Sequence, residues 1–185
     1  MRRNTSSGWG DGTTGVGWPG MVKSLYNYRL SDEDLISIGR LMVGFAMFES
    51  HLNYILFTLR GRAERDVIPS HPTELAGRKL KEVKKLMNRG VAPEIDSFWQ
   101  EIRLSMAHAL PARNMVGHGV LVYATDGEIS FWSQSRLKEL PLSSVLGAEK
   151  WVNYAIHAAF HAQQHLNPNP DGTVHVPQPL PDRPA

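Results

Sequence analysis

The stretch from Ser31 to Leu59 reads SDEDLISIGRLMVGFAMFESHLNYILFTL, and it has the clearest helical pattern in the chain. Ser31 offers a side-chain oxygen that can cap a helix, and the three acidic residues after it suit the positive end of a helix dipole. Apolar residues then recur at intervals of three and four, which is typical of one buried helix face. They are Leu35, Ile38, Met42, Phe45, Leu52, Leu56 and Leu59. We therefore expect one long helix from Ser31 to about Leu59.

One charged residue interrupts this apolar stripe. Counting four residues on from Phe45 leads to Glu49, where a hydrophobic residue would belong. A carboxylate buried without a partner is costly or becomes protonated, so we expect Glu49 to lie within ion-pair reach of Arg113 or Arg103. The sequence does not choose between these two arginines. The alternative is a helix rotated enough to leave Glu49 at a groove, because charged side chains are rarely fully buried.

Two more helices are expected in the middle of the chain. Thr73 can cap a second helix, and Gly90 has the position of a residue that ends one. Pro93 suits the first turn of a third helix. Pro111 should break or kink this third helix, because proline cannot donate the backbone hydrogen bond there. A short helical piece should then run to His118.

A β-hairpin and a last helix complete the pattern. The β-prone runs 120–124 and 128–132 flank Asp126 and Gly127, a pair that favours a tight turn between strands. An amphipathic segment over about 142–166 predicts the last helix. The fold class is therefore mainly α: a helical bundle of about four main helices with a small β-hairpin.

The chain divides into one domain and two tails. Residues 1–24 hold six of the sixteen glycines and no hydrophobic periodicity, so we expect a flexible Gly-rich arm. Residues 25–166 would form the helical domain. Residues 167–185 hold six of the twelve prolines and should form an extended, Pro-rich tail.

The composition excludes several kinds of chemistry and indicates where in the cell the protein is expected. The chain has no cysteine, which excludes disulfides, thiolate zinc sites and cysteine nucleophiles. Its N-terminal residues lack the apolar run of a signal peptide, and the longest apolar stretch carries Glu49, His51 and Asn53. We therefore expect a cytoplasmic protein outside the membrane.

The residues best suited to chemistry lie just before Gly119. Asn114 and His118 are four residues apart and share one helix face, and Arg113 has the reach to join them. An arginine can hold a phosphate through a bidentate fork, and histidine is the side chain best suited to proton transfer near neutral pH. The sequence therefore predicts a site for phosphate chemistry around Arg113, Asn114 and His118.

The pattern Arg113-Asn114-x-x-x-His118 resembles the R-x(4–6)-H motif of the HEPN superfamily, in which a polar residue follows the arginine. The helix that contains Phe45-Ala46-Met47-Phe48-Glu49-Ser50-His51-Leu52 also resembles the helix that packs against this motif in bacterial HEPN-like proteins. The resemblance covers roughly residues 30–166, although only the six-residue motif is specific.

This resemblance implies a fold, a partner and an activity. HEPN proteins are helical bundles, often homodimers that bring two motifs together, and many are metal-independent endoribonucleases in toxin–antitoxin, phage-defence or RNA-processing systems. His118 would be the general acid/base, Arg113 would stabilise charge on the phosphate, and Asn114 would orient the histidine or the RNA, with Glu49 in support. An antitoxin or another partner protein is also implied. The hairpin departs from the simplest HEPN bundles, and a non-catalytic interaction or scaffold module is the alternative.

Two weaker features remain. Residues 60–89 hold nine Lys/Arg against four Asp/Glu, a balance of +5 that could attract RNA phosphates, with Lys81, Lys84 and Lys85 as candidates. A solvated helix face is the alternative for these lysines. His157, His161 and His165 recur every four residues on one helix, but a solvated polar face is favoured over a metal site there. No cofactor is expected.

Overall fold

The computed structural model describes residues 30–63, 75–123, 128–133, 138–167 and 179–184. Within these ranges the chain is mainly helical, with one small antiparallel sheet, which confirms the expected fold class. The expected N-terminal arm, residues 1–24, lies outside the described residues. The elements in chain order are α1 (Asp32–Ala63), α2 (Ala76–Asn88), the 3₁₀ turn η2 (Pro93–Ile95), α3 (Asp96–His118), β1 (Val120–Tyr123), β2 (Ile129–Ser133), β3 (Lys138–Pro141) and α4 (Leu142–Leu166).

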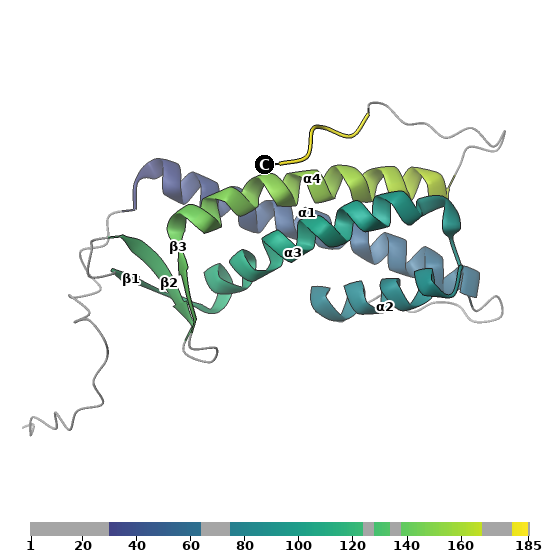
Figure 1. Ribbon diagram of the computed structural model, residues 1–185, viewed down its shortest axis with the longest axis horizontal. Coiled ribbons are helices and arrows are strands. Elements are labelled where there is room, and N and C mark those ends of the chain that lie inside the picture. Colours follow the sequence, from purple (N-terminus) through teal and green to yellow (C-terminus); the bar gives the residue numbers. More distant parts are fainter. Residues whose placement is uncertain (1–29, 64–74, 124–127, 134–137, 168–178, 185) are drawn as a thin grey trace, which may run out of the picture.

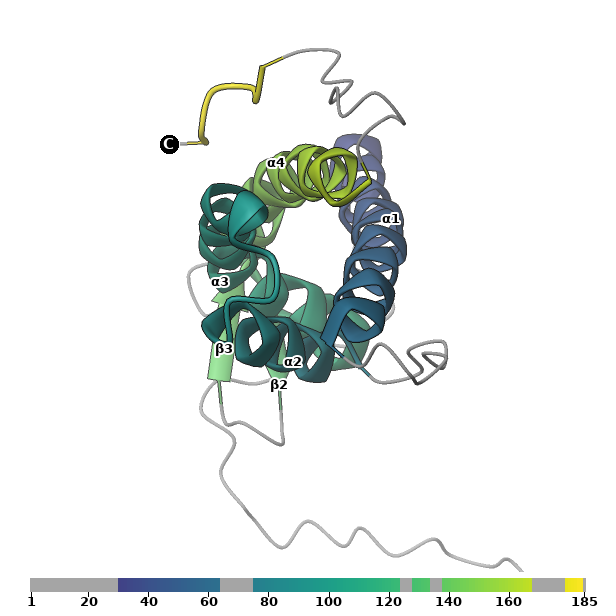
Figure 2. The same cartoon turned by 90° about the vertical axis from the view of Figure 1, so that its right-hand side faces the viewer.

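The three long helices form the body of the molecule. α4 packs along both α1 and α3, while α2 packs mainly on the second half of α1 (Figure 1). Seen end-on, α4 and α2 lie on opposite sides of the bundle, with α1 and α3 between them (Figure 2). The sheet covers one end of the bundle, next to the end of α3 and the start of α4 (Figure 1). One continuous hydrophobic core fills the bundle.

The start of α1 is as predicted, and Phe45, Leu52, Leu56 and Leu59 of its predicted apolar face are buried, but the N-terminal part of that face is not in the core. The backbone N–H of Asp34 donates to Ser31 Oγ at 3.1 Å, and that of Ser31 donates to Asp34 Oδ2 at 3.0 Å. This reciprocal pair satisfies donors that a helix start leaves free. The buried face also includes Leu41, Phe48 and Ile55, which the predicted stripe left out. Leu35 is expected in the core but is exposed. It lies six residues before Leu41, and at 3.6 residues per turn this separation places it on a different side of the helix.

The predicted end of α2 is confirmed at Gly90. Its φ of 69° is the left-handed conformation that glycine adopts without strain. The N–H of Gly90 donates to the carbonyl of Met87 at 2.9 Å, and that of Val91 to the carbonyl of Leu86 at 3.4 Å, as in a Schellman motif. At the other end, the expected cap Thr73 lies outside the described residues. The residue that precedes the helix there is Leu75, whose side chain supplies no cap.

Of the break or kink expected at Pro111, the break is wrong. α3 runs without interruption from Asp96 to His118, and Pro111 is exposed inside it. Ala109, Ala112 and Met115, on both sides of the proline, are buried in the core. Their burial offsets the one backbone hydrogen bond that proline cannot make, so packing overrides the local preference.

The sheet confirms the two paired strands of the predicted hairpin and adds a third strand. The turn expected at Asp126 and Gly127 lies outside the described residues. β1 pairs with β2 in antiparallel register, with Val120 opposite Trp132. β3 pairs with the other edge of β2, with Phe131 opposite Leu140. The sequence does not predict β3, because this strand is short, polar and ends in proline. It depends on pairing with β2 rather than on a pattern of its own.

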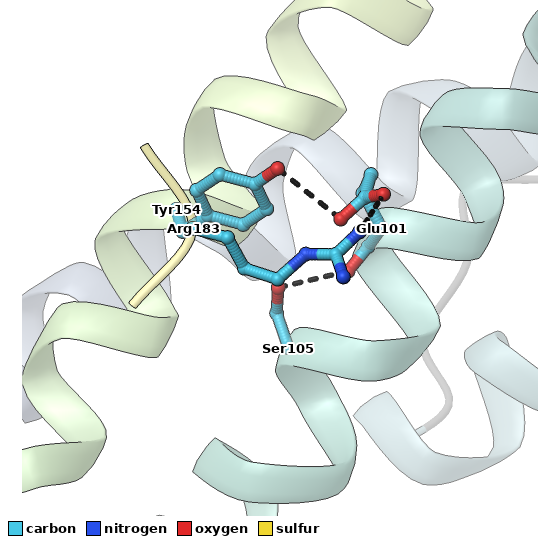
Figure 3. A network of polar contacts seen from close by, with 4 residues as sticks. All are labelled: Glu101, Ser105, Tyr154 and Arg183. Atoms are coloured by element: carbon cyan, nitrogen blue, oxygen red, sulfur yellow. Dashed lines mark hydrogen bonds and ion pairs between the residues drawn. The ribbon is translucent and has the colours of Figure 1, made fainter. Parts of the chain in front are cut away.

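The described part of the C-terminal tail, residues 179–184, lies against α3 and α4 (Figure 3). Arg183 donates to Glu101 Oε1 at 2.6 Å, and the Tyr154 hydroxyl donates to Glu101 Oε2 at 3.1 Å. The Ser105 hydroxyl donates to the backbone carbonyl of Glu101 at 2.8 Å. Burial and the neighbouring Glu101 carboxylate raise the pKa of Tyr154 above its usual value, because both disfavour a phenolate. The contacts join this segment to both helices.

By length and composition alone, α1 could cross a membrane. The same composition is found in core helices of water-soluble proteins, so this is weak evidence. In the structure α1 buries one face against α4 and α2. The opposite face leaves Ile36, Val43, Met47 and Tyr54 exposed.

A candidate site in the groove between α1, α2 and α3

The residues of the sequence motif line one groove, which we call the motif groove. Its volume is about 340 Å³, and it lies between α1, the first turns of α2 and the end of α3. α1 contributes Phe45 and Glu49, and α3 contributes Leu110, Arg113, Asn114 and His118. The α2 side consists of Leu75, Ala76, Gly77, Arg78 and Lys81.

Arg113 is held in the groove by an aromatic ring and an amide. Its guanidinium carbon lies 5.2 Å from the centroid of the Phe45 ring, within the range of a cation–π interaction. Its Nη1 donates to Asn114 Oδ1 at 3.3 Å. Phe45 is buried, so the ring is a rigid support. The two contacts therefore orient the arginine, but neither of them supplies a negative charge to neutralise it.

His118 is more accessible than Arg113. It occupies the last turn of α3 and is exposed, whereas Arg113 and Asn114 are half-buried. Because α3 is continuous, Asn114 and His118 stand one turn apart on the same face. No hydrogen bond from the described residues fixes the imidazole of His118. The ring is accessible from solvent.

Gly119 joins the motif to the sheet. Its N–H donates to the Met115 carbonyl at 2.7 Å, which closes the last turn of α3, and β1 starts at the next residue. A Cβ built on Gly119 would lie 2.4 Å from the Met115 carbonyl oxygen and 3.2 Å from that of Trp132. The first contact, within the last turn of α3, permits only glycine, and the second shows that the backbone of β2 passes close to the helix end. The sheet therefore anchors the end of α3 directly after His118.

Glu49 lies in the motif groove without the expected ion pair. It is half-buried and lines the same groove as Arg113. Among the ion pairs of the described residues, none joins Glu49 to Arg113 or Arg103. Arg103 is exposed, donates to Gln100 Oε1 at 2.9 Å and lines a different hollow. Phe48 rather than Glu49 is fully buried. α1 therefore has the rotation of the alternative, in which Glu49 lies at a groove.

The α2 side of the groove favours anions. The side chain of Leu75 does not cap α2, and the first two residues of the helix, Ala76 and Gly77, line the groove. Free N–H groups and the helix dipole place partial positive charge at such a helix start. Arg78 and Lys81 add two full charges. Glu49 is the opposing negative charge on the lining.

Sequence reasoning does not identify Phe45 and Arg78 as site residues. Phe45 has the pattern of an ordinary core residue, and only its place beneath Arg113 gives it a second role. Arg78 belongs to the basic run 60–89, but the run does not say which cations face the motif. Of the three lysines proposed from the sequence, Lys81 lines the motif groove, and Lys84 and Lys85 line two other hollows.

Two of the three histidines of α4 pack against the ring of Phe98. His161 is buried, with its ring centroid 5.5 Å from that of Phe98, and His165 lies 5.0 Å from the same ring. The expectation of a solvated polar face is therefore wrong for His161. His157 is exposed. No group of three potential metal ligands occurs among the described residues.

No protein-family model, curated protein or solved structure matches this chain. Fold and groove together define a small, mainly helical protein with an arginine- and histidine-lined groove at the end of α3. The resemblance to the HEPN superfamily rests on the sequence motif.

Proposed function

We propose that this chain is a HEPN-like, metal-independent endoribonuclease, or an RNA-directed toxin or defence protein, that acts as a homodimer. The observation that carries the proposal is the convergence of Arg113, Asn114 and His118 on one groove. In that groove Arg113 is oriented by Phe45 and His118 is accessible. Arg113 has no ion pair among the described residues, and together with the start of α2 it makes the groove suitable for a phosphate.

The reaction that suits these groups is transfer of an RNA phosphate to its own 2′-oxygen. His118 takes the 2′-hydroxyl proton as the 2′-oxygen bonds to phosphorus, and the bond from phosphorus to the 5′-oxygen breaks. A proton then passes to that leaving oxygen, from the same imidazole or from the second motif of the dimer. Arg113 balances the charge that builds up on the phosphate oxygens. The products are a 2′,3′-cyclic phosphate and a 5′-hydroxyl.

The test is RNA cleavage by purified protein in EDTA, with and without His118. His118→Ala should abolish cleavage while the protein stays folded, because the side chain is exposed. Loss of a general acid/base lowers rates by about 10²–10⁴-fold. His157→Ala, which removes an exposed histidine on α4 that does not line the motif groove, is the matched control and should cleave as the wild type does. Equal cleavage by the wild type and His118→Ala excludes the mechanism.

The alternative is a non-catalytic interaction or scaffold module with the same fold. One observation favours it: no hydrogen bond from the described residues orients His118. In a homodimer the missing orienting group could come from the second chain, which links the activity to the oligomeric state. Absence of cleavage of any RNA by a protein shown to be dimeric would favour the scaffold.

A further inference from the structure

Three of the five cations of α2 and the residue that follows the helix share one face. α2 contains five Lys/Arg and one Glu. Arg78, Lys81, Lys85 and the C-cap residue Arg89 are spaced by three or four positions, so their side chains follow one side of the helix. All four line a hollow of about 410 Å³ between α2 and the end of α1. From first to last they span about 16 Å along the helix axis, at 1.5 Å per residue.

The acidic residue on this face is already neutralised. Glu82 accepts two hydrogen bonds from Arg60 of α1, from Nε at 2.8 Å and from Nη2 at 2.7 Å. This bidentate pair fixes α2 on α1 and satisfies the carboxylate. Among the described residues, no carboxylate pairs with Arg78, Lys81, Lys85 or Arg89. The hollow therefore presents four cations to solvent and keeps the anion occupied.

The cationic hollow is continuous with the motif groove. Arg78 and Lys81 line both of them. The line of positive charge thus starts at Arg89, follows α2 toward its N-terminus and ends beside Arg113. Lys84 and Arg103 line neither of these two hollows; together with Lys81 they line a third, largely apolar hollow of about 250 Å³ between α2 and α3. Lys84 and Arg103 therefore lie outside this line.

We infer that the face formed by Arg78, Lys81, Lys85 and Arg89 is a phosphate track for single-stranded RNA that leads the strand into the motif groove. This inference rests on the proposed function for the identity of the polymer. A row of cations spaced along a helix matches a ligand with repeated charges rather than a single small anion. The motif groove has the volume of a small-molecule pocket, so it can admit part of a flexible strand but not a duplex.

The test is binding of a labelled single-stranded oligouridylate of roughly 12 nucleotides, a typical length for such sites. Fluorescence anisotropy would be measured in the His118→Ala background, so that the RNA stays intact. The test variant combines Lys85→Glu and Arg89→Glu, two exposed residues that line the track but not the motif groove. The matched control combines Lys84→Glu and Arg103→Glu, which are exposed, change the net charge equally and lie off the track.

The track variant should bind the oligonucleotide at least about tenfold more weakly than the control variant at about 50 mM salt. The slope of log affinity against log salt should become shallower by about 0.7 for each phosphate that the variant no longer neutralises. Equal weakening by the two variants would overturn the inference, as would absence of binding in the parent protein. Stronger binding of an RNA duplex, or equally effective competition by polyglutamate, would also overturn it in favour of another ligand.

RNA cleavage assays distinguish failure of the phosphate-track inference from failure of the proposed nuclease activity. If the track variant binds RNA more weakly and the wild type cleaves no RNA, the phosphate track is supported and the proposed nuclease activity is wrong. If the wild type cleaves and the track variant, with His118 intact, cleaves subsaturating RNA equally fast, the nuclease stands and the track is wrong.

Discussion

The guanidinium of Arg113 lies over the ring of Phe45, with 5.2 Å between the guanidinium carbon and the ring centroid. The two residues come from different helices, so this contact ties the end of α3 to the middle of α1. The ring is buried in the core on one side and supports the arginine at the groove on the other. A core residue thus determines where the positive charge of the site lies.

Phe45→Leu and Arg113→Met should be energetically coupled. Each removes one partner of the contact and keeps an apolar side chain of comparable bulk, and a double-mutant cycle in urea should give a coupling of about 0.5–1 kcal/mol. Phe45→Leu with Arg103→Met is the control cycle, and it should be additive because Arg103 lines another hollow. A coupling of zero in the first cycle would show that the ring does not orient the guanidinium.

Glu49→Gln should leave stability nearly unchanged. The Glu49 carboxylate is half-buried and has no ion pair among the described residues, so its removal should cost less than about 1 kcal/mol of unfolding free energy. A buried ion pair would instead lose about 3–5 kcal/mol when one partner is removed. Glu82→Gln, which breaks the bidentate contact with Arg60, should cost more than Glu49→Gln in the same urea titration. The reverse order would reveal a partner for Glu49.

Two glycines next to His118 should respond to alanine in opposite directions. Gly119→Ala forces a Cβ to 2.4 Å from the Met115 carbonyl oxygen, so it should cost about 1–3 kcal/mol of unfolding free energy. Gly117→Ala, in the last turn of α3, meets no atom closer than Arg113 Nη1 at 3.9 Å and should stabilise the helix by up to about 1 kcal/mol. Differential scanning calorimetry of both variants checks the signs. A stable Gly119→Ala variant would mean that the last turn of α3 can shift to accommodate the added Cβ.

The proposed homodimer predicts which of two introduced cysteines forms a disulfide between chains. The chain has no cysteine, so a single one introduced at Gly117, beside the motif, reports on that surface alone. If two motifs face each other across a two-fold axis, Gly117→Cys should cross-link under mild oxidation, and light scattering should show a dimer at micromolar concentration. Gly39→Cys, at an open position on the outer side of α1, is the control. Cross-linking through Gly39 instead would move the interface to the exposed apolar face of α1.

The ends of the helices follow from the sequence by itself. The cap at Ser31, the left-handed turn at Gly90 and the end of α3 at Gly119 each depend on atoms within a few residues along the chain. Such local hydrogen bonds and steric limits act before any packing. The mainly helical class follows in the same way, because amphipathic periodicity is a property of each segment. The position of Asn114 and His118 on one face is also of this kind.

Packing between distant segments decided the rest. The sequence could not show that α3 continues through Pro111, because the compensation comes from core contacts of Ala109 and Met115. It could not establish the rotation of α1 that buries Phe48 and turns Glu49 to the groove, since rotation depends on where α2 and α4 lie. The strand pairing of β3, the support of Arg113 by Phe45 and the approach of Arg78 to the motif likewise join residues far apart in the chain. Such contacts form only when the helices pack together, and local preferences do not encode them.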